Sequence, residues 1–202
     1  MPTDHGIKTR TSILEHAFRL FATTSYEKVT FSSLEKASGI SRGSITHFFK
    51  NKEAIFMGVI ETFLLDRYTV CSIPAHYRVA LVTFYNYFIE RCREEKQRLE
   101  SMGISNINEA MFYVEVSAFI NLPEFKKIAN EWYLHELSVW KEIIDHAKIT
   151  GEVREDINSE AFSLLFENVY LGTSYAGITV SFGYDIDALQ LAFDSLYSMI
   201  RK

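Results

Sequence analysis

Residues that break helices or cross-link the chain are scarce in this sequence. Only three of its 202 residues are proline and only two are cysteine, so long helices are not interrupted and no disulfide framework is expected. Cys71 and Cys92 also lack the close spacing of metal ligands. No run of eighteen apolar residues occurs, and the segment around Asp4, His5 and Lys8 has no apolar core of a secretory signal. We therefore expect a cytoplasmic protein with no membrane partner, no metal and no cofactor.

The chain as a whole also lacks an excess of basic charge, because its formal net charge is −5. The charge is unevenly distributed. Residues 1–56 hold eight Lys and Arg against five Asp and Glu, a net +3, whereas residues 57–202 hold thirteen against twenty-one, a net −8. Such asymmetry points to nucleic-acid contact at the basic end. A net +3 neutralises few phosphates, so useful DNA affinity favours a dimer.

Signals for strands and for enzymes are missing as well. No stretch alternates apolar and polar residues as a half-buried strand does, so an all-α fold is predicted. After residue 51, helices are expected at about 52–68, 75–100, 107–119, 123–149, 159–181 and 186–200. His135 and His146 share one of these helices, but no HExxH motif, paired Glu-x-x-His motif or P-loop accompanies them. We expect no enzymatic activity.

Residues 30–49 carry the pattern of two short helices joined by a tight turn. Thr30 is a plausible N-cap of the first helix, and Leu34 lies on its apolar face. Gly39 suits the left-handed position after that helix, and Ser41 is a second N-cap. The second helix is expected to turn outward Arg42, Ser44, Thr46 and His47. This is a helix-turn-helix pattern, although an ordinary helical hairpin with a polar outer face fits the segment equally well.

A longer pattern at fixed spacing surrounds this segment. Its members are Arg10, Ile13, Leu14, Ala17, Leu20, Phe21, Tyr26, Glu27, Thr30, Leu34, Ala37, Gly39, Ile40, Ser41, Gly43, Ile45, His47, Phe48, Phe49, Lys50, Asn51, Lys52, Glu53, Ile55 and Phe56. In this pattern residues 10–56 resemble the amino-terminal DNA-binding domain of the TetR family of bacterial transcriptional regulators. The resemblance implies a three-helix domain with a helix-turn-helix over residues 7–67. It also implies a helical effector-binding and dimerisation domain over residues 68–202.

Three positions depart from the family pattern. Thr46 stands where the family usually has a Tyr whose hydroxyl reaches a phosphate, so that contact is in doubt or falls to His47. Ser25 replaces a Gly before the aromatic residue Tyr26. Glu35 stands where Ala is frequent, and its carboxylate is either a solvated charge, the interpretation we favour, or a group that repels phosphate.

The resemblance, with the chemistry of the outward side chains, implies a set of DNA contacts. The predicted DNA-binding residues are Lys8, Arg10, Thr30, Ser32, Arg42, Gly43, Ser44, Thr46, His47 and Lys52. Arg42 and Ser44 are expected at base edges or nearby phosphates, since Arg can bond guanine through two N–H groups. Gly43 lets the backbone approach, and the others are expected to hold the phosphate backbone.

The resemblance also implies an effector pocket and a dimer interface among the remaining helices. The pocket is expected among Phe84, Phe88, Phe112, Tyr113, Trp132, His135, Trp140, Phe166 and Tyr170. The interface is expected among Phe162, Phe166, Val169, Thr173, Ala176, Leu189, Ala192, Phe193 and Leu196. Aromatic residues at helical spacing are equally typical of an ordinary core, and two amphipathic helices can simply close a monomer.

The predicted function is a DNA-binding transcriptional regulator, a homodimeric repressor that a small apolar or aromatic effector releases from double-stranded operator DNA. The alternative is a helical small-molecule-binding protein without DNA binding, because Thr46 and Glu35 weaken the DNA surface.

Overall fold

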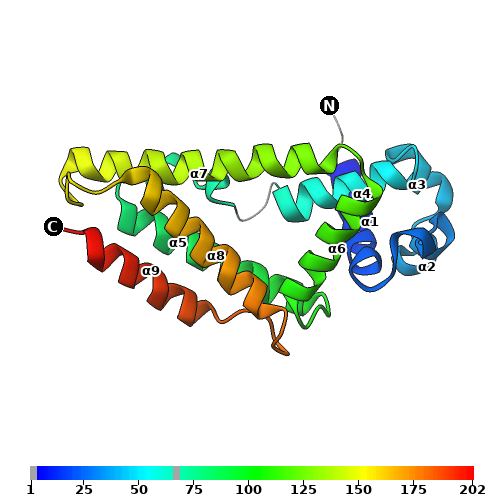
Figure 1. Cartoon of the computed structure of the whole chain (residues 1–202). Helices are drawn as coiled ribbons and strands as arrows, with labels where there is room; N and C mark the ends of the chain where they lie inside the picture. Colours follow the sequence, from blue (N-terminus) through cyan, green and yellow to red (C-terminus); the bar gives the residue numbers. More distant parts are fainter. Residues whose placement is uncertain (1–3, 66–68) are drawn as a thin grey trace. The chain divides into compact units, whose positions relative to one another are not determined.

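The computed structural model describes residues 4–65 and 69–202, which form α-helices joined by turns and short 3-10 segments (Figure 1). Within these residues the only β pairing is an isolated bridge between Val153 and Arg201. The predicted all-α fold is confirmed. No helix of the described residues is long and apolar enough to cross a membrane.

The chain divides into two compact units. One comprises Met1–Arg67 with Ala110–Lys126, and the other comprises Tyr68–Glu109 with Lys127–Lys202. The domain boundary predicted between residues 67 and 68 lies outside the described residues. Residues 110–126, which the sequence placed in the second domain, group with the first unit. The assignment of 7–67 and 68–202 as domains therefore stays a prediction.

The first unit is built on a long amino-terminal helix. Its helices are α1 (Asp4–Thr23), α2 (Phe31–Ser38), α3 (Arg42–Phe48), α4 (Lys52–Ile60) and most of α6 (Ile107–Asn121). The apolar face of α1 is buried against α4, where a Cβ on Gly58 would lie 3.0 Å from Leu14 Cδ2 and 3.3 Å from Phe49 Cε1. Glycine at this position permits the close approach of the two helices.

The second unit has an aromatic core. Its helices are α5 (Leu81–Ser101), most of α7 (Phe125–Thr150), α8 (Ser159–Gly177) and α9 (Ile186–Ile200). The rings of Trp140 and Phe166 stack with centroids 4.9 Å apart, and Phe193 meets them edge-on at 5.7 and 5.2 Å. All three side chains are fully buried. Helix α9 packs against both α5 and α8, and α8 and α9 run side by side in Figure 1.

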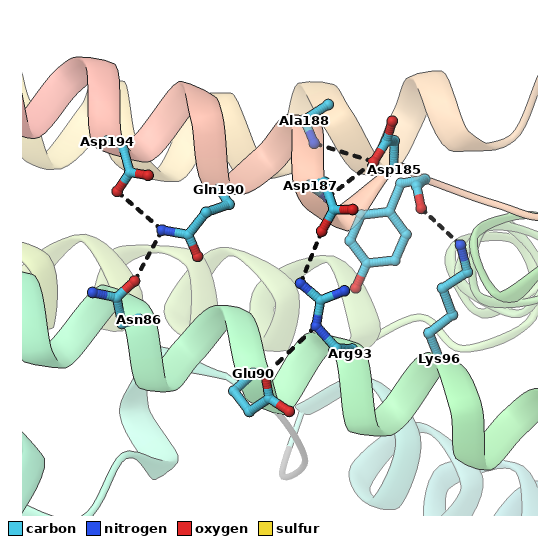
Figure 2. A network of polar contacts seen from close by, with 10 residues as sticks. Asn86, Glu90, Arg93, Lys96, Asp185, Asp187, Ala188, Gln190 and Asp194 are labelled. Atoms are coloured by element: carbon cyan, nitrogen blue, oxygen red, sulfur yellow. Dashed lines mark hydrogen bonds and ion pairs between the residues drawn. The ribbon is translucent and has the colours of Figure 1, made fainter.

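Polar contacts tie one side of α9 to α5 (Figure 2). Arg93 Nη2 donates to Asp187 Oδ1 at 3.0 Å, and Lys96 Nζ donates to the Tyr184 carbonyl at 3.0 Å. Gln190 Nε2 donates to Asn86 Oδ1 at 2.9 Å. These contacts are mostly solvent-exposed and each contributes little, about 1 kcal/mol or less. They nevertheless fix which side of α9 faces its own chain.

Two predicted helix ends differ from the observed ones because of contacts distant in sequence. The helix predicted from residue 75 begins at Leu81, where the Glu152 carboxylate accepts the N–H groups of Leu81 and Val82 at 2.7 and 2.9 Å. The helix predicted to residue 181 ends at Gly177, where a Cβ would lie 2.5 Å from the Tyr184 nitrogen. The helix predicted over residues 186–200 matches α9 at both ends.

The helix predicted over residues 52–68 also ends earlier. The α-helical hydrogen bonding of α4 stops at Ile60, and a π-helical turn follows over Glu61–Leu65. The predicted end at residue 68 lies outside the described residues.

Candidate nucleic-acid interface

Side-chain caps define the helix-turn-helix. Thr30 Oγ1 accepts the Ser33 N–H at 3.1 Å while Ser33 Oγ accepts the Thr30 N–H at 2.8 Å, a reciprocal cap at the start of α2. Gly39 takes the left-handed conformation, with φ of 69°, and its N–H donates to the Glu35 carbonyl at 2.9 Å. Ser41 Oγ then accepts the Ser44 N–H at 3.3 Å at the start of α3. Local residue chemistry therefore sets both helix starts and the turn.

Helix α3 presents one polar side. Ile45 is fully buried and holds the helix on the unit, as does Phe49 directly after it. The predicted outward residues Arg42, Ser44, Thr46 and His47 are all exposed, as is Gly43. That exposure was predicted, whereas their contact with DNA stays a prediction.

Arg42 is held by two residues of α2. Its backbone N–H donates to Glu35 Oε1 at 3.1 Å, and its guanidinium carbon lies 5.8 Å from the centre of the Phe31 ring. Phe31 and Glu35 are one helical turn apart and share a face of α2. Glu35 is exposed, in line with the favoured interpretation of a solvated charge, and its carboxylate in addition satisfies an otherwise unpaired N–H at the start of α3.

The hydroxyl of Thr46 is engaged within α3. It donates to the carbonyls of Arg42 and Gly43, both at 3.0 Å. A hydroxyl whose proton serves its own helix has no donor to offer a phosphate. His47 is exposed on the same helix, with its ring edge-on to Phe48 at 5.2 Å. The phosphate contact is therefore better suited to His47 than to Thr46.

The residues expected to hold the DNA backbone differ in how they are engaged. Lys8 forms an exposed ion pair with Asp4 at 2.8 Å, and the Arg10 guanidinium lies 5.3 Å from the centre of the Phe49 ring. Lys52 is half-buried, and its Nζ donates to the Tyr26 carbonyl at 2.9 Å. Thr30 serves as a cap and Ser32 is exposed. Lys52 therefore has a structural role that the sequence did not indicate.

The predicted effector residues are divided between the two units. Phe84, Phe88, Trp140 and Phe166 are buried against one another in the core of the second unit, and their contact with an effector stays a prediction. Phe112 and Tyr113 belong to the first unit, whereas Trp132, exposed His135 and half-buried Tyr170 belong to the second. A surface groove of about 380 Å³ beside Arg93, Lys96 and Tyr184 contains none of the nine.

A buried carboxyl pair in the second unit was missed as a site by sequence reasoning. Glu136 on α7 and Glu167 on α8 are 2% and 1% exposed. Burial, and then the charge and hydrogen bond of Glu167, raise the pKa of Glu136 to about 9. The available signal was Glu167 itself, a charged residue directly after the apolar residues Leu164, Leu165 and Phe166.

Three of the predicted dimer residues cannot contact a partner. Phe166, Leu189 and Phe193 are fully buried within their own unit, so the prediction for them is wrong. Phe162, Val169, Thr173, Ala192 and Leu196 are half-buried and Ala176 is exposed. The large apolar side chains that these helices expose are different ones: Leu164, Leu165, Tyr175, Leu191 and Met199. The stripe that the sequence revealed is the one that closes the monomer core.

Comparisons with known proteins agree with this architecture. The family model for bacterial regulatory proteins of the tetR family matches residues 13–59. The HTH-type transcriptional repressor Rv1474c of Mycobacterium tuberculosis is 45% identical over 56 residues, which is 28% of this chain and only 30% of that protein. The HTH-type transcriptional repressor KstR2 of Rhodococcus jostii is 26% identical over 175 residues, 82% of this chain and 78% of that protein.

The likeness to solved structures extends over nearly the whole chain. The SmeT–triclosan complex superposes with a TM-score of 0.70 at 16% identity, covering 96% of this chain and 92% of that one. At such identity the likeness establishes the fold. Residues 13–59 thus match the amino-terminal domain of the tetR family of bacterial regulatory proteins, and the whole chain shares its fold with the SmeT–triclosan structure.

Proposed function

We propose that this protein is a homodimeric repressor that binds operator DNA through α3 and releases it when a small effector binds the second unit. The observation that carries the proposal is the exposed Arg42, held from α2 by both its backbone N–H and its ring contact with Phe31. A guanidinium positioned in advance at the start of a recognition helix suits bidentate readout of guanine in the major groove. The related proteins named as repressors support the sign of regulation.

The dimer is supported by the outer faces of α8 and α9. Leu165 and Tyr175 on α8 and Leu191 and Met199 on α9 are 43%, 67%, 70% and 60% exposed. A Cβ on Gly172 would meet no atom of the described residues within 4 Å, so this glycine has no packing reason inside the monomer. Exposed apolar side chains beside an unneeded glycine suit close pairing with a second copy.

Effector binding is supported by the chemistry of the second unit and by a structural neighbour. SmeT has been solved with triclosan, a small aromatic molecule. The corresponding unit of this chain has an aromatic interior on α5, α7, α8 and α9. A ligand bound in this unit shifts DNA affinity only if it binds the DNA-competent and the DNA-incompetent states of the dimer with different affinities.

A selection of bound sequences from random DNA tests the DNA-binding half. Wild type should enrich a two-fold symmetric site, and Arg42→Ala should lose preference at one position of each half-site, about 1–3 kcal/mol of discrimination. Lys126→Ala is a matched control, because Lys126 is an exposed basic residue of the same unit outside the helix-turn-helix. Failure of wild type to enrich any sequence at low salt would favour the alternative of a ligand-binding protein that does not bind DNA.

A further inference from the structure

Two acidic side chains of the second unit lie deep in its interior without a basic partner. Glu136 and Glu167 each accept a hydrogen bond from a neutral donor, the Val70 N–H at 3.3 Å and the Trp140 indole N–H at 3.0 Å. Among the described residues, neither carboxylate has a Lys, Arg or His in an ion pair. The pair is therefore buried without a basic partner, and burial raises the pKa of both carboxyl groups.

One oxygen of each carboxyl group has no donor from elsewhere in the described residues. Glu136 Oε2 and Glu167 Oε1 are buried and have no hydrogen-bond partner among the described residues. The two carboxyl groups lie within hydrogen-bonding reach of each other, but two carboxylates are both acceptors, so a bond between them requires a proton. In the absence of ligand a shared proton is the only occupant that the described residues allow. Whatever negative charge remains on the two carboxyl groups is buried without a partner, and a bound cation would stabilise it.

We propose that the Glu136–Glu167 pair binds the ammonium group of a small organic cation, and that this cation is the effector. The inference rests on the proposed function for its regulatory half and deepens it by naming the ligand class. A primary ammonium group can donate N–H bonds to these two oxygens, and a quaternary one can neutralise them by its charge alone; either can replace the shared proton as the occupant of the pair.

The surroundings favour an organic cation over a metal ion. Among the described residues there is no group of three or more His, Cys, Asp or Glu side chains that could hold a metal. The neighbours are aromatic instead. The Trp140 ring carries the N–H that binds Glu167, and the charges of both carboxylates act on the buried Tyr170 hydroxyl. Aromatic rings beside carboxylates are the setting in which proteins recognise ammonium groups.

The position of Val70 links the pair to the DNA-binding unit along the chain. Val70 opens the 3-10 turn Val70–Ser72, the first helical turn described after the segment Glu61–Leu65 that extends α4. Its N–H is the donor to Glu136. A cation bound at Glu136 Oε2 therefore acts on the same carboxyl group whose Oε1 accepts the Val70 N–H.

Direct titration of the purified full-length chain tests the binding half. The probes are choline against 3,3-dimethylbutan-1-ol, benzyltrimethylammonium against neopentylbenzene, and 2-phenylethylammonium against 2-phenylethanol. Each neutral molecule approximates the shape of its cation, and binding is read by calorimetry and by tryptophan fluorescence. At least one cation should bind about tenfold or more tightly than its neutral counterpart. Failure of all three cations to bind, or equal affinities within every pair, overturns the proposal.

Three variants separate the site from general effects. Glu136→Gln and Glu167→Gln should each weaken cation binding about tenfold or more and leave the neutral affinities unchanged. Glu142→Gln, an exposed residue of the same helix α7, should change neither. The Gln variants keep an acceptor for Val70 or Trp140 and remove the need to take up a proton on folding at neutral pH, so they should unfold at a higher temperature than wild type. Unchanged cation affinity in both Gln variants contradicts the proposed site.

The regulatory half has its own readout. The cation should weaken binding of wild type to its selected DNA sequence and leave DNA binding by Glu136→Gln unaffected. A cation that binds without changing DNA affinity overturns its role as the effector. A wild type that binds cation but never binds DNA overturns the proposed function and leaves the cation site standing.

Discussion

The position of Arg42 depends on contacts with residues of the preceding helix, Phe31 and Glu35. The sequence places it outward at the start of a short helix, but nothing in the spacing indicates that Glu35 would take its N–H and Phe31 would lie beneath its guanidinium. These contacts depend on the angle between α2 and α3 that the Gly39 turn creates. At this position a residue that seemed to weaken DNA binding instead positions the residue expected to read bases.

Gly43 provides a prediction at the same scale. A Cβ on Gly43 would meet no atom of the described residues within 4 Å, so glycine is not required by packing within the chain. Replacing a helical glycine by alanine should raise the free energy of unfolding by up to about 1 kcal/mol. If the α3 backbone lies against DNA, Gly43→Ala should still weaken operator binding about tenfold, measured by fluorescence anisotropy beside thermal unfolding. A more stable variant with unchanged DNA affinity would show that the backbone of Gly43 does not approach DNA.

At the scale of whole helices, the sequence identifies faces more readily than their partners. The strongest apolar stripe of α8 and α9 contains Phe166, Leu189 and Phe193, and it closes the monomer core. The hydrophobic effect acts equally on an intramolecular and an intermolecular surface, so periodicity alone does not distinguish them. Because that stripe is buried within one chain, the apolar side chains that stay exposed on α8 and α9 form a second, outer face.

The outer face predicts the effect of a charged substitution. Leu191→Glu should convert the dimer to a monomer that keeps its helical content, because a carboxylate at a self-paired apolar surface is desolvated in both copies. The dissociation constant of the dimer should rise about 100-fold or more, measured by sedimentation equilibrium. Ile149→Glu is the control, since Ile149 is 84% exposed near the end of α7 and outside this face. A Leu191→Glu variant that remains dimeric would place the interface elsewhere.

Helix ends provide a second comparison at this scale. The bounds of α9 follow from the Asp185 side chain, which accepts the N–H groups of Asp187 and Ala188 at 2.9 and 3.1 Å, so local sequence suffices. The start of α5 depends on Glu152, seventy-one residues from Leu81, and no local pattern reveals it. Caps near in sequence are predictable, whereas caps supplied by another element are not.

For the molecule as a whole, the buried carboxyl pair makes stability depend on pH. The pKa of Glu136 is raised in the folded state, so folding takes up a proton between the ordinary carboxyl pKa and about 9. The contribution is fully favourable below the unfolded pKa and is lost as the pH rises through this window. The slope reaches up to about 1.4 kcal/mol per pH unit for one proton.

Urea unfolding between pH 5 and pH 9 checks this expectation. The free energy of unfolding of wild type should fall relative to that of Glu136→Gln as the pH rises, at one fixed protein concentration because the protein is proposed to dimerise. Glu142→Gln, a solvent-exposed control, should follow wild type. Parallel curves for wild type and Glu136→Gln would mean that Glu136 does not hold the extra proton.

The sequence by itself determined the all-α fold, the helix-turn-helix with its caps and outward residues, and the likeness of its amino-terminal domain to the tetR family. The fold and the helix-turn-helix follow from local chemistry, namely helical periodicity, capping hydroxyls and a glycine that accepts positive φ. Only the tertiary structure decided that Glu35 holds Arg42, that four of the predicted pocket aromatics pack against one another in the core, and that Glu136 and Glu167 meet in the interior. Each of these depends on which residues of different helices become neighbours, and burial then sets the energy of their charges. That information lies in the packing of the helices and not in the spacing of residues along any one of them.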